Sequence, residues 1–282
     1  MKKYLESLAA MCFLFAGLGF AGFGTATAKG QTSKSTPPKV LVIEREFLKP
    51  GRAGSQHQKT ESAFVQAFTE AKSQQYYLAM DSLSGRSRSL FFLGYDTFAN
   101  WQNDLQAMQK NPTLAAAFDS AQQADGDLLS SYESSVFIFR NDLSLRAPVK
   151  VPRMRYMEIT VFRVRPGHKQ DFETLAKMYA DAFQKANLSS AHWAAYEDMY
   201  GAQSGGKYIA ITPMRSLTEV DEGMGSQKQF AVAVGAEQMK KMADLSAAAI
   251  ESSETNLFLF NPKMSYVNDK WKAADPAFWG QK

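Results

Sequence analysis

Cysteine is nearly absent from this chain of 282 residues, whose single cysteine is Cys12. Cys12 lies in an N-terminal segment that we expect to be removed, and Met11 stands before it where a lipoprotein signal requires a small residue, so no lipid anchor is expected. A mature chain without cysteine has no disulfide, no thiolate metal site and no cysteine nucleophile. Its stability must come from packing, for which an apolar content of 45% and an aromatic content of 12% are typical of globular proteins.

Clustered positive charge and long apolar runs are also missing. The 32 Lys and Arg residues and the 28 Asp and Glu residues give a net charge of +4, and no basic run occurs. Because phosphate backbones are bound by clustered basic surfaces, we expect no nucleic-acid partner. Beyond residue 28 the chain has no stretch of about 18 apolar residues, the length that a membrane helix needs. We therefore expect no membrane span once the N-terminal segment has been removed.

The N-terminal segment has the three regions of a secretory signal peptide. The first three residues include two lysines, residues 8–23 are mostly apolar, and Ala26-Thr27-Ala28 forms a small-residue cleavage site. An uncleaved membrane anchor is the alternative, and the glycines and alanines in the apolar run weaken it. We predict a signal peptide at residues 1–28 that is cleaved after Ala28, and a periplasmic or secreted protein.

The rest of the chain contains one pattern written twice. A strand-like segment at residues 40–48 ends in Lys49-Pro50-Gly51, and a similar segment at residues 156–164 ends in Arg165-Pro166-Gly167. A helical pattern follows each of these tight turns. The predicted parts of the chain are a flexible leader (29–39), a first unit (40–140), a linker (141–155), a second unit (156–260) and a C-terminal tail (261–282).

Both units continue in the same order. An apolar stripe at helical spacing follows the turn and includes Phe68 in the first unit and Phe183 in the second. A hairpin comes next, and then a second helical region that is broken at Asn111-Pro112 in the first unit and loosened by Gly223 and Gly225 in the second. The expected hairpin, helical region and closing strand are 76–81 with 89–95, 97–108 with 114–132, and 136–139 in the first unit, and 193–200 with 207–211, 217–222 with 229–251, and 257–260 in the second.

The order β-α-β-β-α-β, used twice, is that of the ferredoxin-like unit of α+β proteins. Two helices cover only one face of such a sheet, and the covalently linked second unit is the obvious cover for the other face. We therefore predict tandem ferredoxin-like units packed sheet to sheet as one barrel, with the helices outside. The aromatic side chains of the tail, Trp271, Phe278 and Trp279, are expected to pack on this body rather than to form a ligand site.

The first strand of the second unit carries a family resemblance. It reads Tyr156-Met157-Glu158-Ile159-Thr160-Val161-Phe162-Arg163-Val164-Arg165-Pro166-Gly167. This segment resembles the opening strand and turn of NIPSNAP-type domains, which belong to the dimeric α+β barrel superfamily, and the shared topology spans nearly all of each unit. The resemblance implies an intramolecular dimeric α+β barrel with Glu158 at the family's usual acidic position, whereas the first unit has Val42 there and Glu44 two residues later. It implies no single activity, because the superfamily includes cofactor-free oxygenases, haem enzymes, isomerases and binding modules.

A site between the two sheets has six candidate residues. Acid/base chemistry needs a carboxylate or imidazole whose pKa is shifted by burial, and we take Glu158 and His192 as the catalytic candidates. Charges on strands can equally protect sheet edges from aggregation. The candidates for ligand binding are Glu44, Tyr77, Trp193 and Tyr196, although the three aromatic residues could also be ordinary core.

The other two histidines, His57 and His168, are interpreted as solvated residues near the starts of helices. No pair of histidines has the spacing of a zinc motif, and no glycine-rich segment has the pattern of a phosphate loop or a nucleophile elbow. We therefore expect no metal ion, no haem and no other cofactor.

Three functions stay open. The first is a binding module for a small apolar or aromatic molecule held between the sheets. The second is a cofactor-independent monooxygenase or isomerase that uses Glu158 or His192 as the proton acceptor. The third is a structural partner protein, and each of the three is compatible with a homo-oligomer. A cavity of about 300 Å³ or more with a polar group would favour the first two.

Overall fold

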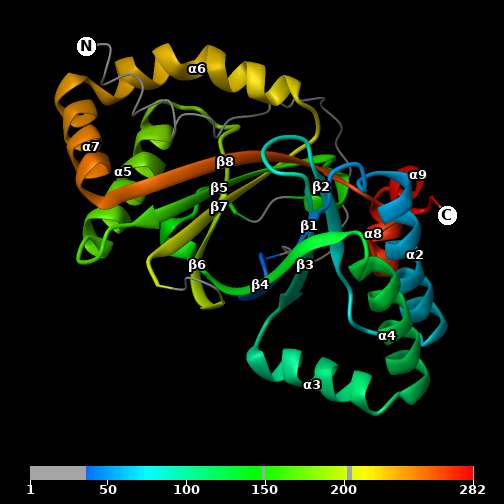
Figure 1. The fold of residues 1–282 in the computed structure, drawn as a ribbon. Coiled ribbons are helices and arrows are strands. Elements are labelled where there is room, and N and C mark those ends of the chain that lie inside the picture. Colours follow the sequence, from blue (N-terminus) through cyan, green and yellow to red (C-terminus); the bar gives the residue numbers. More distant parts are fainter. Residues whose placement is uncertain (1–35, 148–149, 202–204, 282) are drawn as a thin grey trace, which may run out of the picture.

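The computed structural model describes residues 36–147, 150–201 and 205–281 (Figure 1). The predicted signal peptide, its cleavage site and most of the predicted leader lie outside the described residues. No helix among the described residues is both long and apolar enough to cross a bilayer.

The first unit runs β-α-β-β-α-α-β. Its strands pair in the order β4-β1-β3-β2, so that the first strand lies in the middle of the sheet. The elements are β1 (Val40–Leu48), α2 (Ser55–Glu70), β2 (Leu78–Ser82), β3 (Arg88–Tyr95), α3 (Phe98–Gln109), α4 (Pro112–Gly126) and β4 (Leu129–Phe139). Two short 3-10 helices, η1 (Asn141–Leu143) and η2 (Val151–Arg153), lie in the connection to the second unit.

The second unit repeats this order and is followed by a helical tail. Its strands pair as β8-β5-β7-β6, the same arrangement as in the first unit. The elements are β5 (Tyr156–Val164), α5 (Lys169–Lys185), β6 (Ala194–Gly201), β7 (Lys207–Met214), α6 (Thr218–Val234), α7 (Ala236–Ala249), β8 (Ile250–Phe260), α8 (Asp269–Ala274) and α9 (Pro276–Trp279).

The two sheets join into one closed barrel. Strand β2 pairs with β8, where Met80 lies opposite Phe260, and β4 pairs with β6, where Phe139 lies opposite Tyr196. Helices α5, α6 and α7 lie on one side of this barrel and α2, α3 and α4 on the other (Figure 1). The prediction of tandem ferredoxin-like units that pack as one barrel with outer helices is confirmed. Hydrogen bonding at both seams leaves no sheet edge unpaired between the units.

Alternation along each strand separates three apolar cores. Leu41 and Ile43 of β1 point into the barrel, where side chains from both units form one cluster. Val40 and Val42 point outward and pack with residues of the helical layer of the first unit. The corresponding outer face of the second unit forms the third core, under α5, α6 and α7. Parity on a strand therefore decides whether a polar residue faces the barrel interior or the helices.

Several expected boundaries were wrong. The helix expected to continue to residue 132 ends at Gly126. Strands β4 and β8 begin well before the expected residues 136 and 257. Their first halves are polar and largely exposed, so they lack the apolar pattern on which the prediction relied. In the second unit α6 continues through Gly223 and Gly225, and the break between α6 and α7 lies at Gly235, whose φ is 81°.

The tail packs on the barrel. The Trp279 indole N–H donates to the carbonyl of Pro152 at 2.6 Å, and the ring lies edge-on to Phe260. Tyr266 forms a bridge with Tyr77 and thus lies beside the start of β2. Phe278 and Trp279 pack against each other and on the barrel, as expected for the tail aromatics. Trp271 also borders the cavity described next.

Candidate functional site

A cavity of about 450 Å³ lies at one end of the barrel. Its walls come from the starts of β1, β2, β5 and β6 and from the ends of β3 and β7, which all meet at this end. Both units contribute inward-pointing side chains, which include Leu41, Leu78, Phe92, Met157 and Ile211. The cavity is therefore shared by the two halves of the chain.

Segments outside the repeats form the rim of this cavity. Residues 36–38 precede β1, Val151 and Pro152 belong to the connection between the units, and Val267, Asn268 and Trp271 belong to the tail. The hydroxyl of Tyr196 donates to the carbonyl of Pro38 at 3.2 Å, which ties the N-terminal part of the rim to the second unit. Because these segments have no counterpart in the repeat, the two units contribute differently to the cavity.

The lining is mainly apolar and aromatic. Its polar side chains are tyrosine hydroxyls, Thr36, Asn268 and Asp96, and among the described residues Asp96 is the only carboxylate that lines the cavity. Few polar groups in a mostly apolar pocket are typical of sites that hold small organic molecules.

Three of the predicted ligand-binding residues border this cavity: Tyr77, Trp193 and Tyr196. Tyr196 belongs to the core inside the barrel. Trp193 packs mainly in the outer core of the second unit, where its indole N–H donates to the carbonyl of Leu143 at 2.8 Å. Tyr77 packs in the outer core of the first unit. Aromatic residues at the starts of strands thus form both wall and core.

The two predicted glutamates lie elsewhere. Glu158 alternates with Met157 and Ile159, which point into the barrel, so it lies on the outer face of β5. It is 2% exposed, Oε1 has no hydrogen-bond partner among the described residues, and burial raises its pKa to about 8. Glu44 lies on the outer face of β1, and its pKa is raised chiefly by burial. Neither carboxylate lines the cavity.

His192 lies beside the cavity with both ring nitrogens engaged. Nδ1 is 2.8 Å from the carbonyl oxygen of Ser190, and Nε2 is 2.9 Å from that of Pro213. Both ring nitrogens are therefore directed at backbone carbonyl oxygens, which accept hydrogen bonds. In this geometry His192 connects the segment before β6 with β7, and neither ring nitrogen points freely into the cavity.

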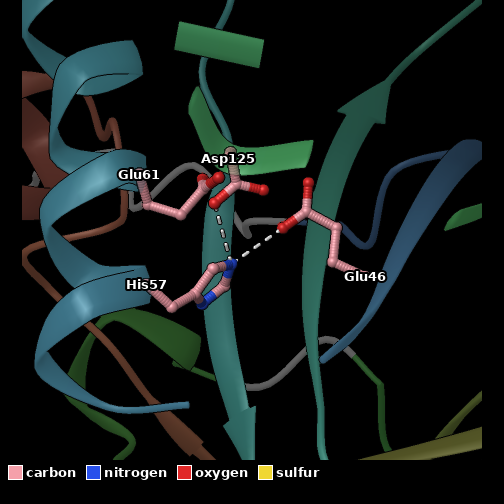
Figure 2. Close-up of side chains that lie close together, drawn as sticks. All are labelled: Glu46, His57, Glu61 and Asp125. Carbon is pink, nitrogen blue, oxygen red and sulfur yellow. Dashed lines mark hydrogen bonds and ion pairs between the residues drawn. The ribbon is translucent and has the colours of Figure 1, made fainter. Parts of the chain in front are cut away.

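The interpretation of His57 as a solvated residue was wrong. Its side chain is 1% exposed and lies between α2 and the sheet, with Nε2 3.0 Å from Oε2 of Glu46 and 3.5 Å from Oδ1 of Asp125. Glu61 completes a cluster of four residues, which we call the His57 cluster (Figure 2). His168, in contrast, is partly exposed and contacts Asp171 at 2.8 Å.

Two signals in the sequence could have found the His57 cluster. His57 and Glu61 are four residues apart, which places them on one face of a helix. Glu46 shares the parity of Val40 and Val42 on β1, so it faces the same helical layer. The contribution of Asp125 depends on how α2 and α4 pack, and no local pattern encodes that.

Comparison with known proteins supports the architecture. No protein-family model and no curated protein matches the chain. The solved structure of an anthrone oxidase-like protein matches with a TM-score of 0.51 and 14% identity over 79% of this chain and 92% of that one. A monooxygenase-like protein of Fusobacterium nucleatum matches with a TM-score of 0.51 and 13% identity over 80% and 93%.

The chain has the dimeric α+β barrel fold. It forms this barrel from two units of a single polypeptide, as the resemblance noted in the sequence implied. At such low identity the similarity establishes the fold alone. A specific relationship of this dimeric α+β barrel to NIPSNAP-type domains stays a prediction.

Proposed function

We propose that this chain is an exported binding protein that takes up a small apolar or aromatic molecule at the end of its barrel. The observation that carries the proposal is the cavity of about 450 Å³ with a mainly apolar lining. Pockets for small organic molecules have volumes of about 300–1,000 Å³ and combine an apolar wall with a few polar groups. Export is supported by the signal-peptide pattern at residues 1–28.

The composition of the wall favours a planar, aromatic ligand. Phe92, Trp193, Tyr196 and Trp271 offer ring faces and edges, and aromatic pairs gain free energy beyond the area that they bury. Asp96 and Asn268 at the rim could orient one polar substituent. The resemblance of residues 156–167 to NIPSNAP-type domains is compatible with this function. We also propose that the protein forms a homo-oligomer.

The direct test has two parts. Organic extraction of the purified protein followed by mass spectrometry should release a small apolar compound in a molar ratio near one. Titration of the emptied protein with planar aromatic compounds should change tryptophan fluorescence saturably, because two of its four tryptophans border the cavity.

Filling part of the cavity should weaken this binding. Ala194 lines the cavity at the start of β6, and Ala194→Phe would occupy part of its volume. We expect the dissociation constant of the bound compound to rise at least tenfold. Val232→Phe on α6 is the matched control, because residue 232 is 77% exposed and away from the cavity. Equal affinity in the wild type and Ala194→Phe would contradict the proposal.

Oxidation of the bound molecule is the second candidate function. It is favoured by the names of the anthrone oxidase-like and monooxygenase-like proteins that share the fold. In such a reaction O₂ converts a methylene group of an aromatic ring system to a carbonyl, and one oxygen atom leaves as water. The proton acceptor would be Asp96, since neither Glu158 nor a free His192 nitrogen faces the cavity. Oxygen uptake that Asp96→Asn leaves unchanged would remove this residue from the reaction.

A further inference from the structure

We infer that the His57 cluster, Glu46, His57, Glu61 and Asp125, binds one divalent transition-metal ion. The cluster lies between the sheet and the helices of the first unit, near the end of β1, whereas the cavity lies at the start of β1 inside the barrel. The inference is therefore independent of the proposed ligand and of the proposed oxidation.

The geometry matches that of a coordination shell. One ligand atom from each of the four residues lies within 4.8 Å of every other. The ligands of a tetrahedral ion with bonds of about 2.0–2.2 Å lie about 3.3–3.6 Å apart, so the most separated pair would have to approach by about 1 Å to complete the shell. The ligands come from three elements, with Glu46 on β1, Asp125 on α4, and His57 and Glu61 one turn apart on α2. Figure 2 shows the four side chains directed toward a common point.

The environment of Glu61 points to cation binding. The residue is 3% exposed, and its Oε1 has no hydrogen-bond partner among the described residues. Its carboxyl group points toward Asp125 (Figure 2). A buried carboxylate without a partner is strongly unfavourable. Burial, with repulsion from Glu46 and Asp125, holds the pKa of Glu61 well above its usual range.

The cluster also lacks positive charge. Three carboxylates converge on one imidazole, and His57 is the only basic side chain of the described part of the chain that forms an ion pair with Glu46 or Asp125. A divalent cation would offset the repulsion among the carboxylates and would give the free oxygen of Glu61 a partner.

The second ring nitrogen of His57 has the environment of a metal-ligating histidine. Nδ1 is 3.4 Å from Oγ of Ser89, and this hydroxyl donates to Oδ1 of Asp81 at 2.5 Å. Because that hydroxyl proton is directed to Asp81, Ser89 can accept the proton of Nδ1. In the ion pair Nε2 carries a proton and donates it to Glu46, and a metal ion would displace this proton and bind the Nε2 lone pair. Such outer partners commonly fix the tautomer of histidine ligands.

The repeat shows that the fold does not need this cluster. Strands β1 and β5 have a register shift at the same place, after Phe47 and after Arg163, which makes Phe162 the equivalent of Glu46. The residues of positive φ that follow α2 and α5, Lys72 and Asn187, are also equivalent, which makes Phe172 the equivalent of His57. Those two phenylalanines pack with ring centroids 5.5 Å apart in the outer core of the second unit. The same site is thus filled by apolar packing in one unit and by buried charge in the other. We expect one metal ion per chain.

The ligand types select the class of metal. One imidazole with three carboxylates suits Zn²⁺, Mn²⁺ or Fe²⁺, whereas Mg²⁺ and Ca²⁺ prefer oxygen ligands alone. Glu46 has a 12% exposed side chain and gives the cluster its contact with solvent. Zn²⁺ is the convenient probe, because it binds tightly and resists oxidation.

The test uses the full chain after chelation with EDTA and dialysis. Calorimetric titration with ZnCl₂ should give one saturable site, and the melting temperature should rise with Zn²⁺. Glu61→Gln and His57→Asn should each raise the dissociation constant at least tenfold. Glu61→Gln is the decisive variant because glutamine cannot supply a carboxylate ligand and keeps the side-chain volume, so the folded state should persist.

Two matched controls separate this site from adventitious surface binding. His168→Asn removes the exposed histidine that contacts Asp171, and Glu158→Gln removes the other buried carboxylate that has a free oxygen. Both controls should bind Zn²⁺ as the wild type does. Absence of a saturable site for Zn²⁺ and for MnCl₂, or equal affinity in wild type and Glu61→Gln, would overturn the inference.

Discussion

Glu158 shows how one buried carboxyl group can make stability depend on pH. Its pKa is raised from an ordinary value of 4.5 to about 8, and burial is the cause. In the unfolded chain the group loses its proton near pH 4.5, while the folded chain keeps that proton until about pH 8. Over this interval the unfolded state binds fewer protons, so the free energy of unfolding falls as pH rises.

Glu158→Gln should remove this part of the pH dependence. Between pH 5 and pH 8 the wild type should lose about 3–4 kcal/mol more of its unfolding free energy than the variant does. Urea denaturation at several pH values measures both profiles. Glu251→Gln, at an exposed position of β8, serves as the control and should follow the wild type. Parallel profiles for wild type and Glu158→Gln would show that Glu158 is not a buried, unpaired acid.

Single residues were the least predictable level of this structure. The buried state of Glu158 could be anticipated from an acidic residue within an apolar strand, but its outward direction could not. The choice of outer face depends on which face the partner unit covers, and Glu158 shares its face with Phe162 and Val164. His57 was misjudged for a related reason, because the carboxylates around it come from three separate elements.

Strands and turns were more predictable than helices. The bounds of β1 and β5 follow from apolar segments that end at Pro-Gly turns, and the structure has them as expected. The bounds of α6 were missed because Gly223 and Gly225 were given the role of breakers. Glycine is tolerated inside a helix at moderate cost, and it ends a helix when the backbone needs positive φ, as at Gly235.

The two kinds of glycine should respond oppositely to alanine. Gly235→Ala forces a side chain into φ 81° and should lower the free energy of unfolding by about 1 kcal/mol, although no atom lies within 4 Å of the new Cβ. Gly225→Ala lies within α6 in open space and should raise it by about 0.5–1 kcal/mol. Chemical denaturation of both variants gives the signs. Two shifts of the same sign would contradict this assignment of the break.

Closure of the barrel is the property of the whole molecule on which the cavity depends. Strands β2 and β4 of the first unit pair with β8 and β6 of the second, and the interior core contains side chains from both units. This closure followed from the duplicated β-α-β-β-α-β order, because each half has an apolar sheet face that its own helices leave uncovered. The cavity itself could not be sized from the sequence, since its rim comes from segments outside the repeat.

Separate expression of residues 40–140 and 156–260 tests the central claim most directly. Each half alone would expose the inner face of its sheet and two unpaired edge strands. We predict that neither half is a monomer with a cooperative unfolding transition, as measured by sedimentation and urea denaturation, and that mixing them restores one cooperative transition. A half that stays monomeric and unfolds cooperatively without the other would contradict the account.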